Sequence, residues 1–468
     1  MSMNRLPTLV RGLDEILHGG LFAGGVYIFE GPPGVGKTTL ANQIAYGFAR
    51  HKDERTLYVT MLAESHARML QHMQAQEFFD RQQVNSRIFY ISGYRELEQD
   101  GLKGVVALLR AELARHRASL LVIDGLVVHR GALSADESVR QFVHELQSLV
   151  SVMSCTCLVL TSGNGNALSA EQTMVDGIFS FEDHGFHWRA ERRMQVRKFR
   201  GSQVTRGRHT FCITDEGLQF FPRLESLPLA PQQAKPRSVA HLATGVAALD
   251  GVLDEGGLLA GSSSVVIGPS GTGKTTLALA FASRATLGDT GLLLSCTEEA
   301  EDLIRAAANL GLSIGGAVTA GALHIERFGL EDESMDQMGH KILRLVDELH
   351  VRRLVVDGLA GLGDTLAFPE RGYRFLGRLL QELRHRGVTS LFTLDPAALS
   401  VAAGTSLAEG VVGWFDNALG FGPVPADGVP TDRRMLAIQK VRGARTRASV
   451  VDVHLATGVT QPSSARTG

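Results

Sequence analysis

Gly31-Pro32-Pro33-Gly34-Val35-Gly36-Lys37-Thr38-Thr39 is the stretch that decides the fold of this chain. It reads G-x-x-x-x-G-K-[ST], in which glycines let consecutive backbone N–H groups turn toward a triphosphate. An apolar run at residues 26–29 precedes it, and a helical pattern follows. This order places a helix N-terminus against the anion. The stretch therefore predicts a phosphate-binding loop, with Lys37 on the β- and γ-phosphates of ATP and the Thr38 hydroxyl on Mg²⁺.

The same motif occurs again in the second half of the chain, together with its surroundings. Gly268-Pro269-Ser270-Gly271-Thr272-Gly273-Lys274-Thr275-Thr276 follows an apolar run at residues 264–267. Similar stretches precede both loops, at residues 12–21 and 245–258. An apolar run ends at Asp124 and again at Asp357, and Lys198-Phe199-Arg200-Gly201 recurs as Lys440-Val441-Arg442-Gly443. Because the spacing is nearly constant across separate motifs, the sequence predicts a tandem duplication.

Each half alternates strand-like and helix-like segments. We expect buried strands at residues 56–62, 88–92, 120–124 and 157–162, an amphipathic helix at 136–150, and hairpin-like strands from 177 onward. This alternation predicts an α/β fold in which a mainly parallel sheet is flanked by helices. Four prolines between residues 222 and 236 indicate a linker. The predicted domains are therefore residues 1–225 and 239–468, joined by a Pro-rich linker at 226–238.

Composition limits the classes of function. The chain has 468 residues, 44% of them hydrophobic and 21% charged, with a formal net charge of −2. These values fit globular domains with full cores and give no overall field that attracts nucleic acid or an anionic membrane. Its four cysteines lack the spacing of a disulfide framework or a zinc site. No run of about 18 apolar residues and no signal-peptide pattern is present, so we expect a cytoplasmic protein that does not enter a membrane.

Carboxylates at predicted strand ends are the candidates for metal and water chemistry. Asp124 and Asp357 end strands at the sheet edge where such folds bind ligands, which predicts that each orients Mg²⁺. In the second half, Glu298 and Glu299 follow a strand and predict a group that polarises the attacking water. The corresponding place in the first half has only Glu64. The two sites are therefore predicted to be chemically unequal, with faster hydrolysis at the second.

Residues 189–208 hold eight basic side chains and one acid, Glu191. Three interpretations remain open. The run could form a nucleic-acid groove, because phosphate contacts need clustered Arg and Lys. It could also supply arginines to the ATP of a neighbouring subunit, or form a solvated strand face. The second half keeps a smaller basic set around Lys440 and Arg442, which favours an ATP-linked role common to both halves.

Taken together, these motifs resemble the KaiC family of clock ATPases and autokinases over nearly the whole chain. The resemblance implies two tandem RecA-like P-loop NTPase domains and a double-ring homohexamer with ATP between subunits. It implies that Lys37, Thr38, Lys274 and Thr275 hold phosphate and Mg²⁺, and that Glu298 and Glu299 form the catalytic pair, with Glu64 as the remaining member in the first domain. Lys198, Arg200, Lys440 and Arg442 match residues that reach the nucleotide of the adjacent subunit.

The chain departs from the family pattern at two places that bear on function. Ala63 stands where the family's first domain has a glutamate. The second domain lacks the family's phosphorylated Ser-Thr pair before Asp416; Thr405 and Ser406 are the nearest hydroxyls. We therefore expect an ATPase that signals through an unidentified protein partner, with autokinase activity as a secondary expectation. The alternatives are a RecA-type DNA-dependent recombinase or helicase and a nucleotide-gated scaffold with little turnover.

Overall fold

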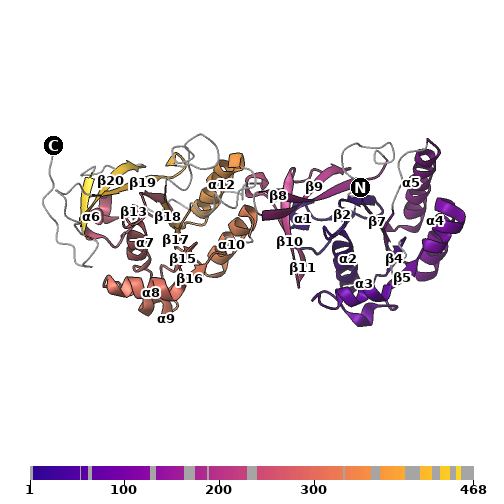
Figure 1. The fold of residues 1–468 in the computed structure, drawn as a ribbon, viewed down its shortest axis with the longest axis horizontal. Helices are drawn as coiled ribbons and strands as arrows, with labels where there is room; N and C mark the ends of the chain where they lie inside the picture. The colour runs from indigo at the N-terminus through magenta and orange to yellow at the C-terminus, as the bar shows by residue number, and fades with distance from the viewer. Residues whose placement is uncertain are drawn as a thin grey trace. The chain divides into compact units, whose positions relative to one another are not determined.

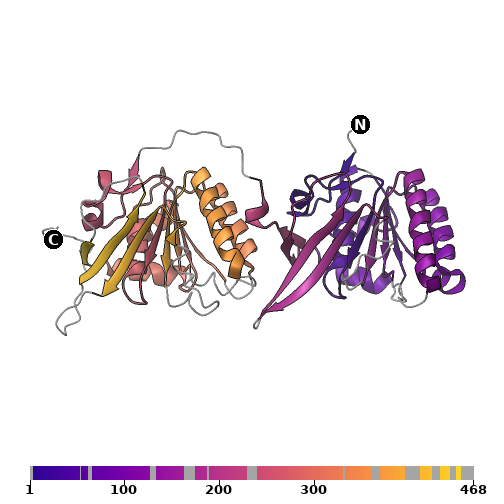
Figure 2. The same cartoon turned by 90° about the horizontal axis from the view of Figure 1, so that it is seen from above.

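The computed structural model describes residues 4–52, 54–61, 66–126, 133–162, 174–186, 189–228, 240–329, 333–359, 369–395, 412–423, 433–442 and 450–454. The chain divides into two compact units, Met1–Leu227 and Pro228–Gly468. In each unit a twisted sheet carries helices on both of its faces (Figure 1, Figure 2).

Among the described residues of the first unit, nine strands form one sheet in the order β11-β10-β9-β8-β3-β7-β6-β4-β5. Neighbouring strands are parallel from β8 to β5, and β9, β10 and β11 continue the sheet as antiparallel hairpins. The bounds of these strands are β3 Val26–Glu30, β4 Thr56–Thr60, β5 Ile88–Ser92, β6 Leu120–Asp124, β7 Thr156–Thr161, β8 Gly177–Phe186, β9 Arg189–Phe199, β10 Arg208–Thr214 and β11 Gly217–Phe221.

The helices of the first unit cover the two faces of this sheet because its central strands bury side chains on both sides. Tyr58 and Val122 point into a core with helix α2, whereas Val59 and Ile123 point into a separate core with α4 and α5. A short strand pair and a one-turn helix precede the phosphate loop. The bounds are β1 Arg5–Leu6, α1 Leu13–Ile16, β2 Leu21–Phe22, α2 Lys37–Lys52, α3 His66–Met73, α4 Tyr94–His116 and α5 Leu133–Met153.

The second unit repeats this plan. Eight of its described strands form one sheet in the order β16-β15-β17-β18-β14-β19-β20-β21, parallel from β16 to β19, and β12 and β13 form a separate antiparallel pair. The strand bounds are β12 His241–Leu242, β13 Leu258–Leu259, β14 Ser263–Ile267, β15 Gly291–Ser295, β16 Leu323–Arg327, β17 Arg353–Asp357, β18 Thr389–Leu394, β19 Asn417–Pro423, β20 Arg433–Val441 and β21 Val450–His454. The helix bounds are α6 Ala247–Asp250, α7 Lys274–Ala282, α8 Ala300–Asn309, α9 Ile314–Thr319, α10 Met335–Glu348 and α12 Gly372–His385.

The predicted α/β fold with a mainly parallel sheet in each half is confirmed. Local boundaries differ by a few residues. The strand expected at 157–162 is β7 and begins at Thr156, because Thr156 pairs with Leu120 at the start of β6. The helix expected at 136–150 is α5 and extends further at both ends. Helix ends depend on contacts outside the periodic stretch, so the pattern locates the element better than its termini.

Candidate functional site

The first phosphate loop joins β3 to α2 through a backbone that favours glycine. Gly34 and Gly36 have φ angles of 78° and 108°, in the left-handed region that side chains rarely adopt. A Cβ at Gly34 would meet no atom within 4 Å, so this side of the loop is open to a ligand. A Cβ at Gly36 would lie 2.7 Å from Ile213 of β10, so packing also requires glycine there. The loop therefore exposes backbone N–H groups at the N-terminus of a long helix.

Gly31 closes the strand end of the same loop, and the second loop matches it. A Cβ at Gly31 would lie 2.5 Å from the carbonyl oxygen of Phe181. At Gly268 the equivalent contact is 2.9 Å, to the carbonyl oxygen of Phe421. Gly271 and Gly273 have φ angles of 75° and 105°, close to those of the first loop. Both loops consequently have the same cradle-like backbone.

The lysine of each loop folds back over it. Lys37 Nζ donates hydrogen bonds to the carbonyl oxygens of Gly31 and Pro32 at 2.7 and 2.8 Å. Lys274 Nζ makes the same bonds to Gly268 and Pro269, both at 2.7 Å. Burial lowers the pKa of both lysines, and nearby aspartates oppose that shift. Each ammonium group therefore lies over the loop, where it could meet a phosphate.

Asp124 lies at the carboxyl end of β6 and meets the phosphate loop directly. Its Oδ2 accepts hydrogen bonds from Thr38 Oγ1 at 2.9 Å and from the Tyr58 hydroxyl at 2.8 Å. Burial raises the pKa of Asp124, whereas the bonds from Tyr58 and Thr38 and the charge of Lys37 oppose this. The structure thus brings Thr38 and Asp124 together, as a shared oxygen site for a hard cation requires. Thr39 follows as the third residue of α2.

The second unit holds its aspartate differently. Asp357 ends β17 and accepts a hydrogen bond at Oδ1 from the Thr393 hydroxyl of the neighbouring strand β18. Thr393 Oγ1 also accepts the backbone N–H of Gly358 at 2.8 Å. Lys274 Nζ lies 3.9 Å from Asp395, just beyond β18. Thr275 and Thr276 occupy the second and third positions of α7.

The two predicted catalytic glutamates have different surroundings. Burial raises the pKa of Glu298, and the charges of Asp357 and Asp302 raise it further. Its backbone N–H donates to Ser295 Oγ at 2.9 Å, which fixes the turn after β15. Glu299 is the N-cap residue immediately before α8 and forms an exposed ion pair with Arg327 at 2.6 Å. Glu298 is therefore the better candidate for a base. Glu64 lies outside the described residues.

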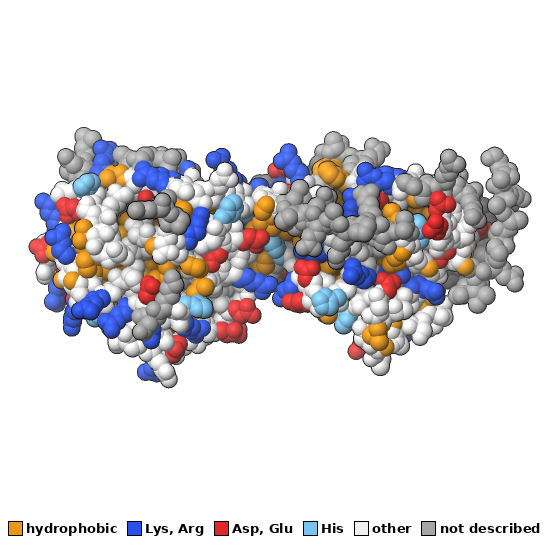
Figure 3. Space-filling view, turned by 180° about the vertical axis from the view of Figure 1, so that it is seen from behind, with side chains coloured by type: hydrophobic (Ala, Val, Ile, Leu, Met, Phe, Trp, Pro, Cys, Tyr) orange, Lys and Arg blue, Asp and Glu red, His pale blue; other side chains and the backbone are white. Residues whose placement is uncertain are grey.

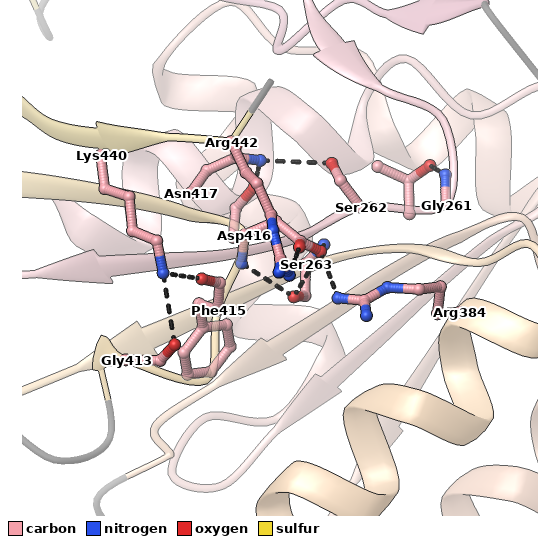
Figure 4. Close-up of polar contacts among 12 residues, drawn as sticks. Gly261, Ser262, Ser263, Arg384, Gly413, Phe415, Asp416, Asn417, Lys440 and Arg442 are labelled. Carbon is pink, nitrogen blue, oxygen red and sulfur yellow. Dashed lines mark hydrogen bonds and ion pairs between the residues drawn. The ribbon is translucent and has the colours of Figure 1, made fainter. Parts of the chain in front are cut away.

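The Lys-x-Arg motifs lie near the amino ends of the central strands, whereas the phosphate loops follow the carboxyl ends; Figure 4 shows the motif of the second unit. Lys440 Nζ donates to the carbonyl oxygens of Gly413 and Phe415 at 3.2 and 2.6 Å, ahead of β19. Arg442 pairs with Asp416 at 3.1 Å, and Asp416 Oδ2 accepts from Ser263 at the start of β14. Gly268 follows the other end of β14, roughly 16 Å away at about 3.3 Å per residue. The motif is therefore not brought to the loop of its own unit.

Lys198 and Arg200 occupy the corresponding place in the first unit. Lys198 pairs with Ile178 near the start of β8, and the Arg200 N–H donates to the Asp176 carbonyl at 2.8 Å. Arg200 also donates from its side chain to Met174 O at 3.0 Å. Burial lowers the pKa of Lys198, with a smaller contribution from Arg200. Both units thus present this motif away from their own phosphate loop.

A family model described as the ATPase KaiC matches residues 6–225 and 242–458. The chain belongs to the KaiC family of ATPases. This confirms the resemblance and the two tandem RecA-like domains. KaiC membership implies that the chain binds nucleotide, and the two loops are the sites whose backbone fits it.

Several KaiC proteins resemble the chain at low identity. The circadian clock oscillator protein KaiC of Picosynechococcus sp. is 27% identical over 381 residues, covering 77% of this chain and 71% of that protein. The circadian clock protein KaiC2 of Synechocystis sp. is 25% identical over 405 residues, covering 84% and 70%. The circadian clock oscillator protein KaiC of Synechococcus elongatus is 24% identical over 413 residues, covering 84% and 76%.

The KaiC match does not favour the nucleic-acid alternative, and neither do the contacts of the basic run. Arg193 is 1% exposed and pairs with Glu191 at 2.5 Å. Arg208 pairs with Glu182 at 3.2 Å. On the face shown in Figure 3, acidic and basic side chains are interspersed over the described surface. Such pairing leaves fewer cations for phosphate contacts.

Three polar residues that the sequence motifs did not predict lie near the strand-end aspartates. Tyr58 and Thr393 contact the two strand-end aspartates, and Asn42 bonds to Tyr58. The sequence does contain a signal for two of them. A tyrosine inside an apolar strand and an asparagine on the buried face of a helix indicate internal hydrogen bonds, because buried polar groups need partners. Their partner could not be read from the sequence. No group of three or more His, Cys, Asp and Glu residues suited to a metal occurs within the described ranges. Within the same ranges, no helix is both long and apolar enough to cross a membrane.

Proposed function

We propose that this KaiC-family protein is a Mg²⁺-dependent ATPase whose domains, residues 1–225 and 239–468, each bind ATP between the subunits of a homohexamer. One observation carries the proposal. Each unit has its phosphate loop at the carboxyl ends of the central strands and its Lys-x-Arg motif near their amino ends. In a ring of like-oriented subunits, such ends can face each other, so Lys440 and Arg442 of one subunit would meet the ATP of the next.

The second site has the side chains that hydrolysis needs. Backbone N–H groups of residues 268–273 and the ammonium group of Lys274 would bind and neutralise the phosphates. The Glu298 carboxylate would orient the attacking water and accept its proton, since a raised pKa makes it a stronger base. Water would attack the γ-phosphorus in line with its bond to the leaving β-phosphate oxygen. Arg327 holds Glu299 in an ion pair, so Glu299 would act less directly.

The oxygen donors present fit Mg²⁺ best in the first unit. Thr38 Oγ1 and Asp124 Oδ2 lie 2.9 Å apart beside the loop, and Mg²⁺ prefers oxygen ligands. When bound, Mg²⁺ would neutralise charge on the β- and γ-phosphates. Thr38 would coordinate Mg²⁺ directly, and Asp124, which is hydrogen-bonded to Thr38, would orient the ion. Thr275 and Asp357 would do the same in the second unit.

The test is γ-labelled ATP with the wild-type protein, Lys37→Ala and Lys274→Ala, following released and protein-bound phosphate together. We expect released phosphate from both sites and a larger loss in Lys274→Ala. Label on the protein would reveal autokinase activity; the nearest hydroxyls, Thr405 and Ser406, lie outside the described residues. Absence of Mg-ATP-dependent phosphate release from wild type would refute the ATPase. Stimulation by single-stranded DNA would revive the recombinase alternative.

Subunit sharing has its own test, carried out in a Lys37→Ala background. Lys274→Ala removes the lysine that would contact the phosphates, and Arg442→Ala removes a cation of the Lys-x-Arg motif. If the site forms between subunits, coassembled Lys274→Ala and Arg442→Ala subunits regain part of the turnover that each alone has lost. Lack of recovery in mixed assemblies, or a monomer by light scattering with Mg-ATP, would contradict the shared site. We also propose that the shape of the ring couples to an unidentified signalling protein partner.

A further inference from the structure

A one-directional chain of hydrogen bonds ends on the Asp124 carboxylate. The Tyr90 hydroxyl donates to Asn42 Oδ1 at 2.8 Å. Asn42 Nδ2 donates to the Tyr58 hydroxyl at 3.3 Å, and the Tyr58 hydroxyl donates to Asp124 Oδ2 at 2.8 Å. Asn42 Nδ2 also donates to the backbone oxygen of Thr38 at 2.9 Å. The chain therefore links three secondary-structure elements to the carboxylate beside the phosphate loop.

Tyr58 and Asn42 lie inside the core, and Tyr90 packs against it as a partly buried residue. Tyr58 and Asn42 are both 0% exposed, and the Tyr58 and Tyr90 rings are 5.2 Å apart. A buried amide or hydroxyl destabilises the fold unless it is hydrogen-bonded, so each member depends on the others. Burial and the neighbouring Asp124 raise the pKa of Tyr58, which keeps its hydroxyl protonated as a donor. The hydrogen bond between Asn42 and Tyr58 is thus shielded from solvent.

The second unit shows that the fold does not require this network. Asn42 is the sixth residue of α2, and the sixth residue of α7 is Leu279. Tyr58 pairs with Val122 and Tyr90, and the matching strands pair Leu293 with Val355 and Ile325. Leu279 and Leu293 are each 1% exposed in the second core. Three apolar side chains therefore fill the space that three polar ones occupy in the first unit.

We propose that Tyr58, held by Asn42 and Tyr90, is a positioning residue for Mg²⁺-nucleotide at the first phosphate loop. Its hydroxyl and that of Thr38 bond to the same carboxylate oxygen, which fixes the rotation of Asp124 toward the loop. In the second unit Thr393 holds Asp357 from the other neighbouring strand instead. This role rests on the proposed function of the first loop as an Mg²⁺-ATP site.

The test measures binding in the full-length Lys274→Ala protein, so that nucleotide is read at the first loop. A fluorescent ATP analogue is titrated with and without Mg²⁺, and the ratio of the two dissociation constants is the Mg²⁺ enhancement. We expect Tyr58→Phe to reduce this enhancement about tenfold, the range for a hydrogen bond to a charged group, and to leave Mg²⁺-free affinity unchanged. The matched control is Tyr27→Phe, which removes a buried hydroxyl that hydrogen-bonds to the backbone of Phe22.

A double-mutant cycle with Asp124→Asn separates positioning from a general loss of structure. If Tyr58 acts through Asp124, adding Tyr58→Phe to Asp124→Asn causes no further loss. An equal loss in both backgrounds, or an unchanged Mg²⁺ enhancement in Tyr58→Phe, would overturn the proposal while leaving the ATP site intact. If the Lys274→Ala protein binds no nucleotide, the proposed first site fails and this role fails with it. Thermal unfolding curves confirm that each variant is folded.

Discussion

The two phosphate loops of this chain share a backbone and differ in what surrounds their aspartates. Lys37 and Lys274 bond to equivalent carbonyl oxygens at nearly equal distances. Asp124 is held by a polar network within the core, whereas Asp357 is held by one threonine on the adjacent strand. The difference shows that the cradle is set by local backbone geometry. The carboxylate environment, by contrast, can be built in more than one way on the same sheet.

The ends of the sheets opposite the loops show a similar contrast. Asp176 and Asp416 both accept a backbone N–H at the start of the central strand, from Val26 and Ser263. Asp416 pairs with Arg384 and Arg442, which help to lower its pKa against the effect of burial, whereas the Arg200 side chain of the first unit donates to the backbone oxygen of Met174. Each unit therefore keeps one structural plan while its charged contacts change.

Replacing the loop lysines should give the largest difference between the sites. Lys274→Ala is expected to reduce steady-state ATPase activity by about a hundredfold at the second site, because the cation on the phosphates is lost. Lys37→Ala should remove a smaller part of total turnover. Phosphate release by each variant, measured beside the double variant as background, checks the order. Equal losses would remove the predicted inequality.

The glutamate pair should separate next. Glu298→Gln is expected to lower kcat at the second site about a hundredfold, as for loss of a general base, with little change in KM. Glu299→Gln should change kcat only a few-fold, since that side chain is in an exposed ion pair with Arg327. Both are measured in a Lys37→Ala background. A larger effect at Glu299 would reverse the assigned roles.

The pH profile sharpens the same distinction. The Glu298 carboxylate must be ionised to act as a base, and burial beside Asp357 raises its pKa. Turnover at the second site should therefore fall about tenfold per pH unit below that raised pKa, beginning at a higher pH than an ordinary glutamate would give. In Glu298→Gln this acidic limb should disappear from a kcat–pH curve. Its persistence would assign the limb to another group.

The smallest expected effect concerns equivalent positions in the cores of the two units. Leu279→Asn would bury an amide among Leu293 and Ile325 without the partners that Asn42 has, and should destabilise the second unit by about 2 kcal/mol. The reciprocal Asn42→Leu should also destabilise the first unit, because Tyr90 would lose its acceptor. Chemical denaturation of each variant tests this. A neutral Leu279→Asn would show that the second core accommodates polar groups.

Much of the fold was predictable because its signals are local. Glycines at residues 31, 34 and 36, the following lysine and the apolar strands identify a phosphate loop, an α/β fold and a duplication. The strand ends at Asp124 and Asp357 were also placed correctly on β6 and β17. The roles of Glu298, Glu299, Lys440 and Arg442 stay predictions, to be decided by the experiments above.

The two phosphate loops can be located from the sequence, because a continuous motif encodes its own backbone conformation. The hydrogen-bond partners of each aspartate, and the end of the sheet at which each Lys-x-Arg motif lies, depend on the tertiary structure. Tyr58 reaches Asp124 because β4 lies beside β6 in a particular register, and Thr393 reaches Asp357 because β18 lies beside β17. Register depends on long-range pairing of strands, which no local pattern specifies. The two similar loops therefore acquired different surroundings only when the sheets formed.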